Sequence, residues 1–191
     1  MSDQIGTLNA TTMTVTGNLT ANTVTNFTLQ TTGVMVQDTL INTTSGLTAD
    51  FTSITSNVRT IILLLNGVSV NAAAKLAVQI GPAAGIETTN YSYSAYDSQG
   101  ASGSGSASSN IPLQLLNMAA AITAIGEVRL NLIDAATNTW IFTTKITELN
   151  GSTHTFTSGV KALAGGLTRL RLTTVAGVYA FDAGSINIQY M

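Results

Sequence analysis

The chain lacks cysteine and carries little charge. Of its 191 residues only 8% are Asp, Glu, Lys or Arg, with 9 acidic residues against 7 basic ones. Without cysteine, disulfides and thiolate metal sites are excluded. The basic residues are scattered singly along the sequence, so they form no stripe that could neutralise phosphates. We therefore expect no binding to nucleic acid.

Long apolar runs are also absent. The most apolar stretch, residues 61–65, is far too short to span a bilayer, so no membrane partner is expected. The N-terminus has no basic segment followed by an apolar run, and a secretory signal is not expected. Hydrophobic residues nevertheless make up 45% of the chain. This content argues against disorder and suffices for one buried domain with an appendage.

The first part of the chain, residues 1–50, is rich in Thr and Asn and almost uncharged. No ionisable side chain lies between Asp3 and Asp38. Two Thr-Val-Thr runs, at 14–16 and 23–25, form a loose internal repeat. Thr and Val favour extended backbone because branching at Cβ restricts χ1, yet the segment has too few apolar residues for a core. The pattern predicts an extended N-terminal arm or a short β stem that is completed by other copies or by a larger surface.

Residues 51–191 predict an all-β head domain. Short apolar stretches alternate with turn signals, a spacing typical of an antiparallel β-sandwich of jelly-roll type. Between residues 139 and 149 the alternation places Trp140, Phe142 and Ile146 on one face. We expect that face to lie inside the sandwich, with Trp140 as a core anchor.

Turn and loop signals divide the head into its elements. Asn66-Gly67 and Asn150-Gly151 predict two tight hairpin turns. The Gly/Ser-rich residues 98–110 predict a long mobile loop. Residues 113–125 are the one helix candidate, because Ala, Leu and Met dominate there, although a strand context could override this propensity.

The sequence contains no recognisable catalytic constellation. His154 is the only histidine and has no nucleophile motif around it, so we interpret it as an exposed strand residue. The carboxylates are isolated from one another, and Asp134 is expected to open a turn rather than to bind calcium. We therefore assign no catalytic, cofactor-binding or metal-binding residue, and we expect neither a cofactor nor an enzymatic activity.

Three tyrosines, Tyr91, Tyr93 and Tyr96, stand beside the Gly/Ser-rich loop. Exposed aromatic rings there could form a platform on which a sugar stacks. The shared face of Tyr91 and Tyr93 favours packing in the core instead.

Three segments resemble a β domain common in virion proteins of tailed bacteriophages. They are G-P-A-A-G-I-E-T-T-N-Y at residues 81–91, N-T-W at 138–140 and F-D-A-G-S-I-N-I at 181–188, and they occur in the family's order. The resemblance covers about residues 52–190, and the Thr-rich arm also resembles stems that precede such domains. Asn90 departs from the pattern, because the family has glycine at that place.

The resemblance implies a non-enzymatic structural protein of the virion, often trimeric, with a jelly-roll-like head. A short arm with one compact head leaves no room for a long shaft. We therefore expect a capsid decoration, cement or head-knob protein, made in the host cytoplasm, that forms a homotrimer and binds the major capsid protein on the capsid surface. The alternative is a short tail fibre or receptor-binding tip that recognises a host surface glycan. A carbohydrate-active enzyme is disfavoured because paired carboxylates are lacking.

Overall fold

The computed structural model describes residues 35–98, 113–120, 122–149 and 153–191. All of them belong to one compact unit that spans residues 33–191. The predicted stem repeats and most of the predicted Gly/Ser-rich loop lie outside the described residues.

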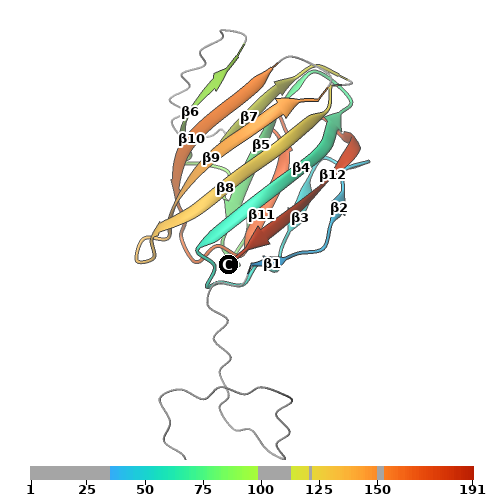
Figure 1. Ribbon diagram of the computed structural model, residues 1–191. Helices are drawn as coiled ribbons and strands as arrows, with labels where there is room; N and C mark the ends of the chain where they lie inside the picture. The colour runs from blue at the N-terminus through green and yellow to red at the C-terminus, as the bar shows by residue number, and fades with distance from the viewer. Residues whose placement is uncertain (1–34, 99–112, 121, 150–152) are drawn as a thin grey trace, which may run out of the picture. The chain divides into compact units, whose positions relative to one another are not determined.

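Twelve strands and no helix make up the described part of the chain (Figure 1). The strands are β1 (Val36–Gln37), β2 (Ile41–Asn42), β3 (Ala49–Phe51), β4 (Thr60–Val70), β5 (Ala74–Gly81), β6 (Ser92–Asp97), β7 (Leu113–Met118), β8 (Ala124–Asp134), β9 (Thr139–Glu148), β10 (His154–Ala162), β11 (Arg169–Thr174) and β12 (Phe181–Tyr190). The larger sheet has the order β1-β12-β4-β8-β9-β10-β6, and β2 also pairs with β12. The smaller sheet has the order β3-β11-β5-β7 and packs behind the larger one.

The pairing of early with late strands is nested. β1 pairs with β12, β3 with β11, β4 with β8, and β5 with β7, and every pair is antiparallel. Nested antiparallel pairs that are distributed over two packed sheets are the jelly-roll arrangement. The expected antiparallel jelly-roll-like sandwich is therefore confirmed. β9, β10 and β6 add to the jelly roll and widen the larger sheet beyond β8.

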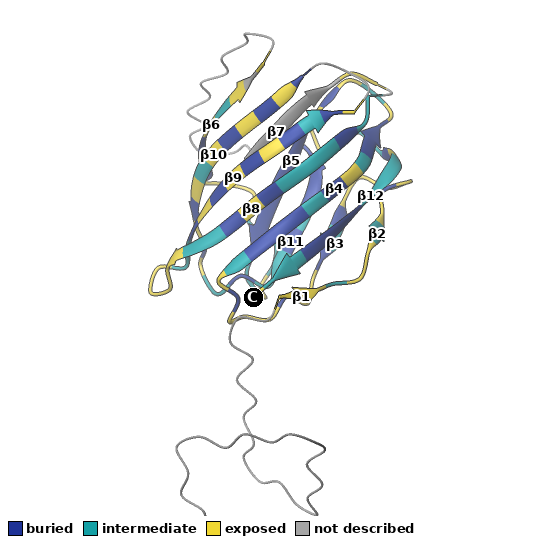
Figure 2. Ribbon diagram, viewed as in Figure 1, coloured by how far each residue is buried: buried dark blue, intermediate teal, exposed yellow. Residues whose placement is uncertain are grey.

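The core lies between the two sheets and follows the period-2 alternation of the strands. On β9 the side chains of Trp140, Phe142 and Ile146 are each about 1% exposed, as the sequence predicts. Figure 2 shows that buried residues alternate with more exposed ones along most of β9 and β10. A strand whose outer face is open to solvent has this pattern.

One predicted turn is wrong, because Asn66-Gly67 lies inside β4 rather than between two strands. The register of β4 with β8 shifts between Leu65 and Val68, so the two residues form a bulge. Gly67 has a φ of 66°. A G1-type bulge and a type I′ hairpin turn both place glycine at positive φ, so the same dipeptide suits either.

The predicted helix over residues 113–125 is also wrong. Leu113–Met118 forms β7, which pairs with β5, and β8 begins at Ala124. Propensity favours a helix here by only tenths of a kcal/mol per residue, and pairing with a neighbouring strand exceeds that preference.

The sandwich begins before the expected boundary between residues 50 and 51. β1 and β2 pair with β12, and β3 pairs with β11, so the segment from Val36 onward belongs to the two sheets. The apolar residues of this segment are too sparse to predict a core of their own, but the sheets supply the partner strands. Ala49 and Phe51 are buried against the core for that reason.

Candidate functional site

The outer face of the larger sheet carries an exposed aromatic pair, Tyr96 on β6 and Phe156 on β10. The two residues are directly opposite each other in the antiparallel register, so their side chains leave the sheet on the same face. Tyr96 is 51% exposed and Phe156 is 52% exposed. Lys145 of β9 lies opposite Phe156 on its other side. A row of two aromatic rings and one amine therefore crosses three neighbouring strands.

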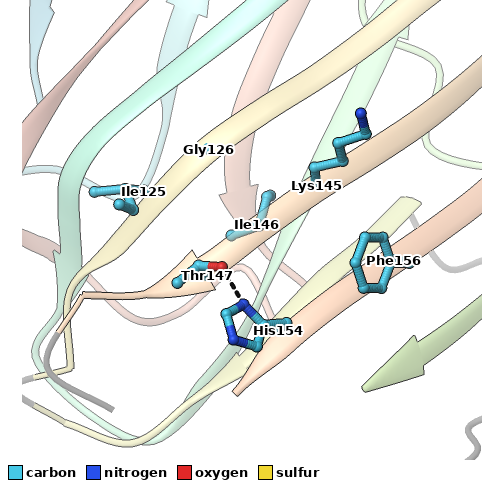
Figure 3. Close-up of a pocket in the computed structure, with 7 residues that line it drawn as sticks. All are labelled: Ile125, Gly126, Lys145, Ile146, Thr147, His154 and Phe156. Atoms are coloured by element: carbon cyan, nitrogen blue, oxygen red, sulfur yellow. Dashed lines mark hydrogen bonds between the residues drawn. The ribbon is translucent and has the colours of Figure 1, made fainter. Parts of the chain in front are cut away.

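A shallow pocket of about 220 Å³ opens beside this row (Figure 3). It is lined by Ile125, Gly126, Lys145, Ile146, Thr147, His154 and Phe156. β8, β9 and β10 all contribute to it, and Figure 3 shows Ile125 and Phe156 on opposite sides with His154 and Thr147 between them. The pocket thus has two apolar sides and a polar rim.

Gly126 is the glycine among the residues that line the pocket. Its φ is 138°, and a Cβ built there would collide with the carbonyl oxygen of Lys145. With this backbone conformation any side chain would be directed into the backbone of β9, so only glycine fits.

His154 is held at the pocket by two hydrogen bonds. Its Nδ1 lies 2.5 Å from the hydroxyl of Thr147, and its backbone N–H donates to the hydroxyl of Ser98 at 2.9 Å. The side chain is exposed, as the sequence predicts. Because Nδ1 makes the contact with Thr147, Nε2 is available to a ligand.

The 81–91 segment has a structural role at the opposite, buried face of β10. Glu87 forms an ion pair with Lys161, which is 3% exposed, and its other carboxylate oxygen accepts the backbone N–H of Ala164 at 2.8 Å. A buried ammonium requires such a partner, since an uncompensated charge in the interior is very costly. Glu87 therefore fastens the loop after β5 to β10 and to the segment that follows it.

Tyr91 completes this cluster. Its hydroxyl accepts the N–H of Ile80 at 2.7 Å and donates to the carbonyl of Glu87 at 2.8 Å. The Nζ of Lys161 lies 5.4 Å from the centre of the Tyr91 ring, within the range of a cation–π contact. Burial raises the pKa of the Tyr91 phenol well above its ordinary value. The expected core packing of Tyr91 and Tyr93 is confirmed, since they are 1% and 7% exposed.

Asn90 stands at a position that requires left-handed backbone. Its φ is 61°. Asn adopts this conformation more readily than other residues with a side chain. Asn90 therefore suits a turn position at which glycine is otherwise favoured.

The terminal segment of the resemblance forms the bulged part of β12. The register of β12 with β4 shifts on both sides of Ala183. Gly184 has a φ of 91°, and a Cβ there would collide with the backbone of Gly67. The two glycines thus let two bulged strands approach within backbone contact.

Asp134 opens the turn between β8 and β9, as the sequence predicts. Its carboxylate accepts the N–H of Ala136 at 2.8 Å and the hydroxyl of Thr137 at 2.7 Å. The hydrogen bonds from Thr137 and Ala136 lower the pKa of Asp134. Among the described residues, no group of three or more His, Asp or Glu could hold a metal ion. The described part also contains no helix long and apolar enough to cross a membrane.

Phe156 is the feature that sequence reasoning missed. Its stretch of β10 reads Thr-His-Thr-Phe-Thr, and burial of the apolar residue is the usual expectation. In the structure Thr155 and Thr157 face inward and Phe156 faces outward. The register with β9 sets this choice, because Thr155 pairs with Ile146 on the inner face. The outward direction of Phe156 could be predicted only from the register of β10 with β9.

Comparisons with models of protein families, with curated proteins and with solved structures found no match to this chain.

Proposed function

We propose that this chain is a structural protein of a tailed-bacteriophage virion that decorates the assembled capsid and stabilises it. The observation that carries the proposal is the place of the three resembling segments. The 81–91 segment holds a buried cluster, the 138–140 segment begins β9 with the core Trp140, and the 181–188 segment forms bulged β12. The residues in the three segments that resemble the virion domain have structural roles in the fold, which supports a structural protein.

The composition supports a protein that works in an assembly. Only 8% of its residues are charged, whereas a solitary soluble domain usually has a mixed, strongly charged surface. In this proposal the uncharged N-terminal residues pair with the major capsid protein, and three copies associate. Extended Thr/Val backbone can add a strand to an exposed sheet edge.

Quantitative mass spectrometry of purified particles tests the position on the virion. A decoration protein should be present in a number comparable to the capsomers, whereas a tail component should be present in a few tens of copies or fewer. A ligand that binds the assembled lattice but not its free subunits must stabilise the lattice. Particles that lack the protein should therefore assemble but break at a lower temperature. Because few charges take part, bound protein should stay attached in molar salt.

The second candidate is a short tail fibre or receptor-binding tip that recognises a host surface glycan. The exposed pair Tyr96 and Phe156 favours it, since large aromatic side chains on an open sheet face often mark a binding surface. Particles without the protein that keep full heat stability but fail to adsorb to host cells would support this candidate and contradict the capsid role.

A further inference from the structure

We propose that the pocket beside Phe156 binds one pyranose ring of a glycan and that Tyr96 contacts the next ring. The inference rests on the second candidate function above and names the residues that would hold the sugar. Its test concerns the isolated chain, so its failure is distinguishable from failure of the capsid role.

The first argument is the inversion of burial along β10. The side chains of Thr155 and Thr157 are buried, whereas Phe156 is half exposed. This arrangement gives up the burial free energy of a large aromatic ring. Departures from the local rule are expected where a surface has a function.

The second argument is the size and shape of the pocket. Its volume of about 220 Å³ is below the roughly 300–1,000 Å³ typical of sites for drug-sized ligands. One six-membered ring fits such a space, whereas a folded partner requires a far larger contact. Ile125 and Phe156 stand on opposite sides of the pocket and can cover the apolar faces of a ring (Figure 3).

The third argument is the chemistry of the rim. His154 offers Nε2, Thr147 offers a hydroxyl, and Lys145 offers an ammonium group on the neighbouring strand position. A pyranose has an apolar C–H face and hydroxyl groups around its edge, which matches apolar sides with polar groups at the rim. Tyr96 extends the aromatic surface from Phe156 and can carry a second ring of the same glycan.

A second copy of the chain is the competing occupant of this surface, since a twofold interface pairs a patch with itself. The oligomeric state of wild type and Phe156→Ala distinguishes the two occupants.

The test is a printed array of neutral hexose, N-acetylhexosamine and acidic-sugar glycans, probed with the purified full chain. A glycan retained on the array is then titrated in solution against wild type, Phe156→Ala, Tyr96→Ala and the matched control Val178→Ala. Val178 is 65% exposed, lies between β11 and β12 and does not line the pocket. All three side chains are surface residues, so the variants should fold.

The expected result is a fall in affinity of about tenfold or more for Phe156→Ala, since removal of a central aromatic contact typically costs at least that much. Tyr96→Ala should weaken glycans of two or more rings more than single sugars, and Val178→Ala should leave binding unchanged. Retention of no glycan, or equal binding by wild type and Phe156→Ala, would overturn the proposal. A Phe156→Ala variant that changes the oligomeric state without any sugar binding would overturn it in favour of a protein contact. None of these outcomes bears on copy number in the virion, so the proposed capsid role is tested separately.

Discussion

Trp140 illustrates at the residue scale how packing outweighs a missing hydrogen bond. The side chain is 1% exposed, and among the described residues its indole N–H has no partner. The ring fills space between the sheets, and its apolar area more than offsets the unpaired donor.

Replacing Trp140 by Ala should therefore cost about 3–5 kcal/mol of unfolding free energy, as is usual for emptying a large aromatic site. Trp140→Phe should cost clearly less, because it keeps most of the volume and removes the unpaired N–H. Denaturant unfolding of the three proteins measures both differences. Since Trp140 is the only tryptophan, wild-type emission should be blue-shifted and should move to longer wavelength on unfolding. Emission typical of a water-exposed indole in the folded protein would contradict the burial.

The raised pKa of Tyr91 predicts a specific loss of stability in alkali. In the unfolded chain the phenol ionises near its ordinary pKa of about 10, whereas in the folded protein it keeps its proton. Above pH 10 the unfolded state therefore binds fewer protons, and the free energy of unfolding falls as pH rises.

Tyr91→Phe should be less stable than wild type at pH 7, by about 1–3 kcal/mol, because the N–H of Ile80 loses its partner. The difference in unfolding free energy between the two proteins should shrink above pH 10, because ionisation of Tyr91 in the unfolded state destabilises only the wild type. Chemical denaturation from pH 7 to 11 measures the gap. A gap that stays constant or widens would show that Tyr91 does not titrate as proposed.

At the element scale the Glu87–Lys161 pair connects the loop after β5 to the inner face of β10. Lys161 is almost fully buried, whereas the side chain of Glu87 is 24% exposed. Lys161→Met removes the buried charge, and Glu87→Gln leaves that charge without its counter-ion. Breaking a buried pair from one side costs about 3–5 kcal/mol, and solvent screening of Glu87 places the expected loss toward the lower figure.

We expect Glu87→Gln to be more destabilising than the double variant Glu87→Gln/Lys161→Met. An apolar side chain needs no counter-ion, so the second change should recover part of the loss. A double-mutant cycle by urea unfolding checks this order. Additive effects of the two changes would mean that the pair contributes little coupling.

The paired bulges of β12 and β4, where the two backbones lie in close contact, give a second prediction at the element scale. Gly184→Ala places a methyl group against the backbone of Gly67 and also forces a side chain into positive φ. Gly177 has a φ of 68° but open space around it, so Gly177→Ala carries the backbone strain alone.

Gly177→Ala should cost about 1 kcal/mol, and Gly184→Ala should cost several times more or prevent folding. Thermal unfolding and expression yield compare the two variants. Equal effects would show that strain alone accounts for both glycines.

The same elements show what sequence can predict. Alternation predicts the inner face of β9 correctly, because successive side chains of a strand point to opposite faces of the sheet. Local signals fail at Asn66-Gly67, which forms a bulge instead of a turn, and at residues 113–125, which contribute strands instead of a helix. In both cases the pairing strand, and not the local sequence, decides the structure. The pocket could not be predicted for the same reason, since Phe156 faces outward through the register of β10 with β9.

For the whole molecule, the boundary of the sandwich makes two truncations differ. Deleting residues 1–34 should leave the thermal midpoint unchanged, because the described strands begin at Val36. Deleting residues 1–50 removes β1, β2 and most of β3, together with the ion pair of Asp50 and Arg171. That loss should lower the midpoint by about 5 °C or more.

Differential scanning calorimetry of the two truncations tests this difference, and a binding assay with stripped particles tests anchoring. If the N-terminal residues hold the protein on the capsid, the 1–34 deletion should stay folded but lose particle binding. A folded deletion variant that binds at wild-type occupancy would remove the anchoring role.

The nested pairing also has a consequence for synthesis on the ribosome. β12 is translated after the other described strands, yet it lies between β4 and the short strands β1 and β2. Until it emerges, the edge of β4 that pairs with β12 stays exposed, and an unpaired edge of an apolar strand promotes aggregation. Nascent chains stalled within β12 should consequently recruit chaperones, whereas released chains should close the sheet in one late step.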